Sequence, residues 1–263
     1  MTADCNIFVN GIIYETVVKS LIIIPTYNEA GNIERLIRSI FAIRPDYHIL
    51  VIDDNSPDGT AAAVEMLFTT HPGKIHLLKR KGKLGLGTAY ITGFKWAIGR
   101  NYEYVFEMDA DFSHDPVYLP SLHKACMEEG ADLAIGSRYV SGVNVVNWPL
   151  GRILMSYLAS AYVRLVTGMK IKDTTAGFKC YKAEVLRSVD LDAITFRGYA
   201  FQIEMKFAVW KLGYTITEIP IIFTERRHGS SKMTGGIFNE ALWGVIIMKF
   251  KSFFRNYSRT PSS

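Results

Sequence analysis

Short apolar runs alternate with amphipathic stretches through the first half of the chain. The runs are rich in β-branched residues and predict buried strands at 21–24, 49–52, 75–78 and 104–108. Between them, apolar positions recur at helical spacing, which predicts helices over 33–40, 61–68 and 88–98. This alternation with short connections indicates an α/β fold, with a Rossmann-like, mostly parallel central sheet flanked by helices.

The second half of the chain is predicted to continue in the same style. We expect helices over 119–129 and from 182, a helix that begins at 201–205, and strands at 133–135 and 216–223. Residues 144–150 indicate a loop, and residues 173–179 indicate a polar turn. The strongly apolar stretch 152–166 fits either a core helix or a helix that touches lipid.

We expect three parts along the chain: an N-terminal extension at 1–19, a main domain at 20–236, and an amphipathic C-terminal helix and tail at 237–263. The extension contains Asn10-Gly11, which is typical of a hairpin turn. The tail mixes aromatic, basic and apolar residues, which fits a membrane surface as well as a packed final helix. No run reaches the ~18 apolar residues of a membrane span.

Polar clusters follow three of the predicted strands, where each strand ends. Their residues are Asn28/Glu29, Asp53/Asp54 and Asp109/Asp111. Ligands of parallel α/β folds bind at such carboxyl ends, and two positions along a strand point to the same side. Asp109 and Asp111 therefore suit a divalent ion such as Mg²⁺, whose shell is completed by water and substrate phosphates. The cluster predicts a metal-bridged site for a sugar-nucleotide diphosphate, and the alternative is an acidic turn.

Two basic loops contain glycine. Residues 79–87 combine spaced glycines with four cations, and residues 225–232 form the second loop. The first loop fits a phosphate-binding loop or an ordinary solvated loop, since it matches neither GxxxxGK[ST] nor GxGxxG.

Composition narrows the function classes. The chain has 263 residues, is 49% hydrophobic and carries a net charge of +5, which suits acidic ligands or an anionic membrane surface. It has no dense Lys/Arg stripe with interleaved aromatic residues, so we expect no nucleic acid partner. The three cysteines are scattered, which indicates neither a disulfide framework nor a zinc site and favours a reducing, cytosolic setting.

A series of motifs resembles the family 2 glycosyltransferases, in particular those that make dolichyl- or polyprenyl-phosphate mannose. The matching segments occur in the same order from about Lys19 to Lys232: 25–29, 53–60, 83–90, 108–111, 137–139, 201–205 and 226–232. The resemblance implies a GT-A fold, a GDP-mannose donor, a polyprenyl monophosphate acceptor, and Mg²⁺ or Mn²⁺ as cofactor.

The resemblance also implies roles for individual residues. The nucleoside half of the donor would be held by Pro25, Tyr27, Glu29, Ile52 and Asp54. Asp109 and Ala110 would contact the donor, Asp111 would be the main metal ligand, and Ser113 stands where some relatives carry a further ligand, Gln. The basic residues Arg138, Arg226 and Lys232 would surround the diphosphate and acceptor phosphate, and the acceptor phosphate would also meet Arg152 and Ser156.

The expected chemistry is consistent with these residue types. A leaving diphosphate needs a cation, which the metal on Asp111 together with Arg226 and Lys232 would provide. A phosphate monoester is mostly dianionic at neutral pH, so the acceptor needs no strong base, and Arg138 can grip phosphate through two bonds. One displacement should invert the sugar and give a β-linked product. The histidines at 76, 114 and 228 are then expected to be ordinary polar residues.

Two alternatives stay open at this point. In the first alternative, an enzyme of the same fold uses UDP-glucose or a UDP-N-acetylhexosamine as donor. In the second alternative, the chain is a non-catalytic module that binds sugar nucleotides or lipid phosphates. The presence of both Asp109 and Asp111 counts against the second alternative. Some relatives carry spanning helices after the catalytic domain, and this chain shows none. We therefore expect peripheral contact with the cytoplasmic face of a membrane, with a small membrane-anchoring partner as a further possibility.

Overall fold

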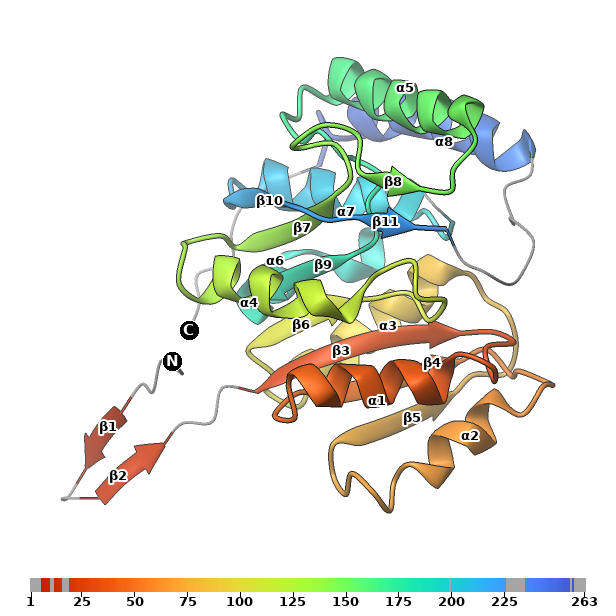
Figure 1. Cartoon of the computed structure of the whole chain (residues 1–263). Helices are drawn as coiled ribbons and strands as arrows, with labels where there is room; N and C mark the ends of the chain where they lie inside the picture. The colour runs from red at the N-terminus through yellow and green to blue at the C-terminus, as the bar shows by residue number, and fades with distance from the viewer. Residues whose placement is uncertain are drawn as a thin grey trace.

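A seven-stranded sheet forms the centre of the molecule (Figure 1). The structure, a computed structural model, describes residues 6–9, 12–15, 19–198, 200–225, 235–255 and 257. The strand order is β10-β7-β9-β6-β3-β4-β5. The bounds are β3 Ser20–Thr26, β4 His48–Asp53, β5 Ile75–Lys79, β6 Tyr104–Glu107, β7 Leu133–Ser137, β9 Lys179–Lys182 and β10 Ile216–Pro220. Only β9 pairs antiparallel with its neighbours within this sheet, which confirms the expected mostly parallel sheet.

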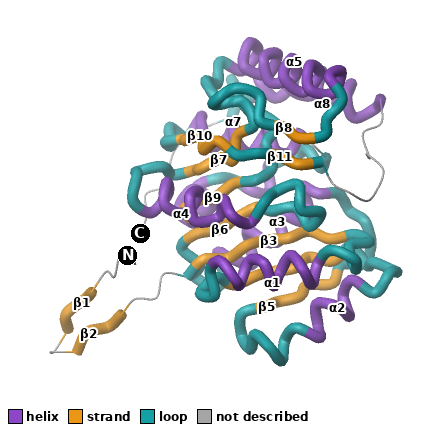
Figure 2. Tube along the Cα trace, viewed as in Figure 1, coloured by secondary structure: helices purple, strands orange, loops and turns teal. Residues whose placement is uncertain are grey.

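Helices cover both faces of the sheet, as Figure 2 shows. Buried side chains of α1 (Ile33–Ile43), α2 (Thr60–Met66) and α4 (Leu119–Met127) pack on one face. The other face carries α3 (Leu86–Ile98), α6 (Ala183–Ser188) and α7 (Ala200–Lys211), with α5 (Leu150–Thr167) and α8 (Gly235–Lys251) outside them. Two short 3₁₀ turns, η1 (Pro116–Tyr118) and η2 (Leu191–Ala193), complete the helical elements.

The apolar pattern correctly located the core of the first half. All four side chains at 21–24 in β3 are fully buried. The periodic positions of α1 (Ile33, Leu36, Ile37 and Ile40) are fully buried as well. Each such burial contributes roughly 1.5–3 kcal/mol before the entropy of ordering is counted.

The sequence missed strand β9. Residues 173–179 were expected to be a polar turn that leads into a helix from 182, but Lys179–Lys182 form a central strand between β6 and β7. The strand was missed because Lys179 is charged, although its ammonium is fully buried and pairs with Glu107 at 2.9 Å. The partner lies far away in the sequence, so local polarity gave the wrong result.

Smaller elements also differ from the expectation. The expected loop 144–150 contains β8 (Val145–Val146), which pairs in parallel with β11 (Phe223–Thr224). The late strand predicted at 216–223 is therefore divided between β10 and β11. Near the N-terminus, β1 (Asn6–Val9) and β2 (Ile12–Glu15) pair antiparallel, and the Asn10-Gly11 turn lies outside the described residues.

Helix α5 is not a buried core helix. Its side chains Leu154, Leu158 and Leu165 are 58%, 54% and 85% exposed, so that interpretation of 152–166 is wrong. Helix α8 packs beside it, with Tyr162 Oη donating a hydrogen bond to the carbonyl of Leu242 at 2.7 Å. None of the helices in the described part of the chain is long and apolar enough to cross a bilayer.

Candidate functional site

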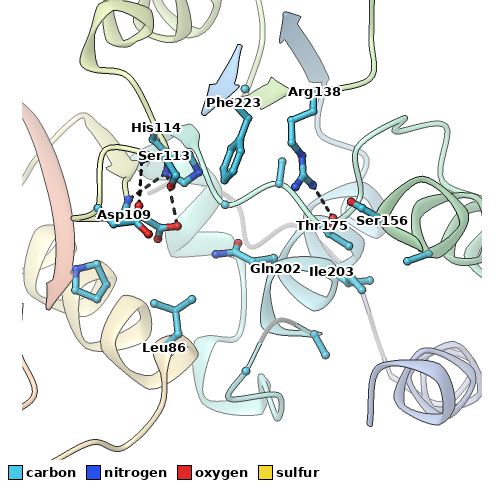
Figure 3. Close-up of a pocket in the computed structure, with 18 of the residues that line it drawn as sticks. Leu86, Asp109, Ser113, His114, Arg138, Ser156, Thr175, Gln202, Ile203 and Phe223 are labelled. Carbon is cyan, nitrogen blue, oxygen red and sulfur yellow. Dashed lines mark hydrogen bonds and ion pairs between the residues drawn. The ribbon is translucent and has the colours of Figure 1, made fainter. Parts of the chain in front are cut away.

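One cavity of about 810 Å³ collects most of the predicted site residues. It lies at the carboxyl ends of the parallel strands and extends between α5 and α7, and Figure 3 shows part of its lining. The predicted residues in its wall are Pro25, Tyr27, Glu29, Asp54, Asp109, Ala110, Asp111, Ser113, Arg138, Arg152 and Ser156. Ile52 is not among them, because its side chain is fully buried in the core. Arg226 and Lys232 lie outside the described residues.

The polar loop after β4 is held by its own side chains. Asp53 is buried and accepts hydrogen bonds from the Thr26 hydroxyl at 3.0 Å and the Ser56 amide at 2.9 Å. Asp58 accepts one from the amide of Ala30 at 3.0 Å, which joins this loop to the loop after β3. Much of the 53–60 motif therefore builds the wall rather than facing the ligand.

The loop after β6 presents the two carboxylates that were expected to hold a metal. Ser113 donates its amide hydrogen to Asp111 Oδ1 at 3.1 Å, and the Tyr90 hydroxyl donates to Asp109 Oδ1 at 3.4 Å. His114 Nδ1 accepts a hydrogen bond from the amide of Asp109 at 3.1 Å (Figure 3). The ring stacks on Phe178 with centroids 5.0 Å apart.

His114 makes a structural contact, and the sequence offered no signal for it. Burial lowers the pKa of His114 to about 4, so the ring is neutral near pH 7. A neutral ring can accept through Nδ1, and this bond fixes the backbone of Asp109.

The donor atoms here fit a hard divalent cation that is completed by substrate. Asp109 and Asp111 line the cavity, and Ser113 lies beside Asp109 (Figure 3). Within the described residues no group of three or more His, Cys, Asp or Glu side chains is placed to hold a metal. Mg²⁺ commonly takes only one or two protein carboxylates together with water and substrate phosphates. The two carboxylates therefore match an ion that binds with a phosphate ligand.

Arg138 was expected to grip phosphate, but its fork engages a carboxylate of the protein. Its Nε donates to Asp173 Oδ2 at 2.7 Å, and its Nη2 donates to Asp173 Oδ1 at 2.6 Å and to Thr175 Oγ1 at 2.8 Å. Burial alone would raise the pKa of Asp173, but Arg138 and its hydrogen bonds hold this pKa below its ordinary value. The contact of Arg138 with a phosphate stays a prediction.

Asp173 is a residue that the sequence did not single out. It is fully buried at the start of the 173–179 segment, and its amide donates a hydrogen bond to Glu218 Oε1 at 2.9 Å. Since the pair with Arg138 spans 35 positions of the sequence, no local pattern indicates it.

Arg152 also has a carboxylate partner. Its Nη1 donates to Glu225 Oε1, and its guanidinium lies 4.2 Å from the ring centroid of Trp148. Ser156 follows one turn later on α5 and lines the same wall. The predicted acceptor-phosphate residues are thus together, although Arg152 is already partly neutralised.

Behind the loop after β6 lies a buried charged network. Glu107 accepts hydrogen bonds from Tyr181 Oη at 2.8 Å and Gln202 Nε2 at 2.9 Å, besides its ion pair with Lys179. Lys206 Nζ donates to the carbonyls of Thr174, Ala176 and Gln202. Gln202 therefore links α7 to the strand that ends at the two aspartates, which explains part of the 201–205 motif.

The far end of the cavity is apolar. Its wall there comes from Met155, Leu158, Ala159 and Val163 of α5, Ile203 of α7 and Leu242 of α8. One cavity thus joins carboxylates at strand ends to an apolar space between helices. This arrangement suits a ligand pair in which one member is a polar phosphate ester and the other has a hydrocarbon part.

Known proteins resemble the chain over most of its length. The model of the family described as glycosyl transferase family 2 matches residues 21–190. A polyprenol monophosphomannose synthase of Mycolicibacterium smegmatis is 45% identical over 232 residues, which are 86% of this chain and 87% of that protein. An undecaprenyl-phosphate mannosyltransferase of Micrococcus luteus is 45% identical over 230 residues, 86% of this chain and 93% of that protein.

Solved structures share the fold at low sequence identity. A mannosyltransferase from Pyrobaculum calidifontis, in complex with GDP-mannose and Mn²⁺, gives a TM-score of 0.58 at 20% identity, covering 92% of this chain and 66% of that chain. A glucosyl-3-phosphoglycerate synthase from Mycobacterium tuberculosis, in complex with Mn²⁺, UDP and glucosyl-3-phosphoglycerate, gives 0.62 at 17% identity, covering 89% and 79%.

Proposed function

Because the chain belongs to glycosyl transferase family 2, we propose that it transfers mannose from GDP-mannose to the phosphate of a polyprenyl monophosphate. The chain is a glycosyltransferase with the GT-A fold, as the resemblance implied. Both relatives at 45% identity are named for joining mannose to a polyprenol-type phosphate. The observation that carries the proposal is a cavity that has both paired carboxylates and an apolar space in its wall.

The donor occupies the end at the strand termini. Tyr27, Glu29 and Asp54 would take its nucleoside, and Asp109 and Asp111 would hold Mg²⁺ or Mn²⁺. Such an ion, when bound, neutralises charge that develops on the leaving diphosphate. The chain keeps the two carboxylates in place, because Ser113 donates to Asp111 and Tyr90 donates to Asp109, while the Asp109 amide donates to His114 Nδ1. Little reorganisation is therefore needed.

The acceptor occupies the other end. Its prenyl chain would lie along the apolar wall of α5, α7 and α8, and its phosphate would lie near Arg152 and Ser156. A dianionic phosphate is already a nucleophile, so no base has to remove a proton. Attack on the anomeric carbon from the face opposite the diphosphate inverts that centre and gives the β-linked product.

A membrane contact is part of the proposal. Leu154, Leu158 and Leu165 of α5 and Trp243 and Phe250 of α8 are more than half exposed, and they lie on adjacent helices. An apolar surface of this kind is typical of helices that lie in a membrane interface. We expect peripheral binding to a cytoplasmic membrane face; a small anchoring partner on the same surface is the alternative occupant.

A donor panel tests the reaction. Purified protein with a polyprenyl phosphate and Mg²⁺ or Mn²⁺ is given GDP-mannose, UDP-glucose or UDP-N-acetylglucosamine, each with a radiolabelled sugar. We expect label in the lipid extract with GDP-mannose alone. Label from a UDP-sugar instead would replace the donor, and donor binding without any transfer would favour a binding module.

A further inference from the structure

The basic residues of the cavity differ in how far the protein already uses them. Within the part of the chain that the structure describes, Lys83, Arg138, Arg152 and Arg197 line the wall. Arg138 is paired with Asp173 and Arg152 with Glu225. Lys83 lies over the ring of Tyr27, with Nζ 4.9 Å from the centroid. Arg197 was not among the residues that the sequence indicated.

Arg197 has no such partner among the described residues. Arg197 is an exposed residue that lines the cavity, and its side chain makes no ion pair or hydrogen bond with residues 19–198, 200–225 or 242–255. Among the described side chains the Arg197 guanidinium therefore has no carboxylate partner, whereas the Arg138 fork is occupied by Asp173.

The backbone that carries Arg197 is held from α7. Glu204 Oε2 accepts hydrogen bonds from the amides of Thr195 and Phe196, each at 2.9 Å, and Oε1 accepts one from the Thr195 hydroxyl at 3.3 Å. Glu204 is 6% exposed and belongs to the 201–205 motif. Its carboxylate thus fixes the turn directly before Arg197, while leaving the guanidinium unengaged.

The glycines of the 79–87 loop hold the same turn from the other side. The amide of Gly87 donates to the carbonyl of Arg197 at 2.9 Å. A Cβ on Gly87 would lie 2.7 Å from the carbonyl oxygen of Phe196, and a Cβ on Gly85 would lie 3.1 Å from Cβ of Arg197. Two motifs that the expected donor contacts left unexplained, the spaced glycines and Glu204, therefore converge on one arginine.

We propose that Arg197 binds a phosphate oxygen of a substrate and that Glu204 is its positioning residue. The inference rests on the proposed function, which supplies two phosphate-bearing substrates: the donor diphosphate and the acceptor monoester. A guanidinium suits either one, because it donates charge-assisted hydrogen bonds in a planar arrangement. Since the backbone of the turn is already ordered, binding has to order only the side chain, which lowers the entropic cost.

Substitution of Arg197 by alanine tests the contact. The Arg197→Ala variant should keep its melting temperature, because the replaced side chain is exposed. The matched control is Arg187→Ala, which removes an exposed arginine of α6 that does not line the cavity. Binding of GDP and of UDP is titrated calorimetrically with Mg²⁺, and transfer is measured at varied polyprenyl phosphate. Using both nucleotides keeps the phosphate question separate from the identity of the donor.

Each outcome has a defined meaning. A loss of roughly 10- to 100-fold in nucleotide affinity, the size expected for a hydrogen bond to a charged group, assigns Arg197 to the donor diphosphate. Unchanged nucleotide affinity with a KM for polyprenyl phosphate raised by about the same factor assigns it to the acceptor. If Arg197→Ala matches Arg187→Ala in both measurements, the proposal is wrong, even though mannose transfer itself continues.

A double-mutant cycle tests the positioning role. Glu204→Gln should weaken the same parameter as Arg197→Ala, by a smaller factor, because the amide keeps only one acceptor oxygen. In the Arg197→Ala background, Glu204→Gln should have no further effect on that parameter. Full additivity would mean that Glu204 acts only on the fold. The Arg197→Lys variant should recover part of the affinity, since it restores the charge without the planar fork.

Discussion

Helices α5 and α7 both line the cavity, and they invert the usual relation between side-chain type and burial. Helix α7 buries Gln202, Glu204 and Lys206, none of them more than 6% exposed. Helix α5 leaves Leu154 and Leu158 more than half exposed. A buried polar group is costly unless it is paired, and an exposed apolar patch is typical of a contact surface. We infer that α7 supports the site from inside and that α5 meets something outside the protein.

The largest effect is expected from removal of the Asp111 carboxylate, which lies at the strand end that α7 supports from inside. Asp111→Ala should lower mannose transfer by on the order of 10³-fold or more, because metal-assisted charge stabilisation contributes several kcal/mol. Binding of GDP should also lose its dependence on Mg²⁺ or Mn²⁺, while the melting temperature stays close to that of the parent. Undiminished transfer would contradict the metal assignment.

A second test addresses the internal network beside α7. Glu107→Gln leaves the ammonium of the fully buried Lys179 without its carboxylate. Breaking a buried ion pair on one side typically costs ~3–5 kcal/mol of unfolding free energy, measurable by urea denaturation. The control is Glu103→Gln on an exposed carboxylate, which should change stability by less than ~0.5 kcal/mol. Equal stability of the two variants would argue against a scaffold role for the network.

A third test uses pH, with a reference on the sheet face away from α7. Burial lowers the pKa of His123 to about 4, against about 6.5 in an unfolded chain. The unfolded state then binds more protons between these values, so stability falls as the pH falls from 6.5 towards 4. We expect a loss of roughly 2 kcal/mol from this group between pH 7 and pH 5. The unfolding free energy of His123→Gln should change less between pH 7 and pH 5. An unchanged pH dependence would contradict the assignment to His123.

The smallest expected effect concerns the outer surface. The double variant Leu154→Ser/Phe250→Ser removes two exposed apolar side chains from α5 and α8. It should weaken co-sedimentation with anionic liposomes by about 30-fold, because each of the two side chains contributes on the order of 1 kcal/mol on partial burial. Nucleotide affinity should not change. The control is Met66→Ser on α2, which also replaces an exposed apolar side chain. A similar loss of liposome binding in the control would contradict a specific role for the surface of α5 and α8.

The sequence predicted the elements whose signals are local. The β-branched runs, the helical spacing of α1 and the polar residues at strand ends all depend on neighbours within a few positions, and the strands and α1 are as expected. Three of the strand-end aspartates, Asp54, Asp109 and Asp111, also meet in one cavity, because parallel strands bring their carboxyl ends to one edge.

What the sequence missed depends on distant partners. Strand β9 looks polar in the sequence because it contains Lys179. The carboxylate that pairs with this ammonium belongs to Glu107, 72 positions earlier in the chain. The roles of His114 and Asp173 depend on ring stacking and on an arginine from another loop. The exposure of α5 could not be read from its composition, since a core helix and a surface helix of this kind contain the same residues.

The direction of β9 has a consequence for how the molecule can be altered. Since β9 runs against β7, residues 138–178 leave the sheet and return to it at the same rim. The Arg138–Asp173 ion pair connects the outgoing and the returning segment near this rim. The Gly136 amide donates a hydrogen bond to the carbonyl of Phe178 at 2.9 Å. Because both ends of the excursion lie at one rim, we expect that a change of length in its outer part, around α5, leaves the register of β3, β4 and β5 unchanged.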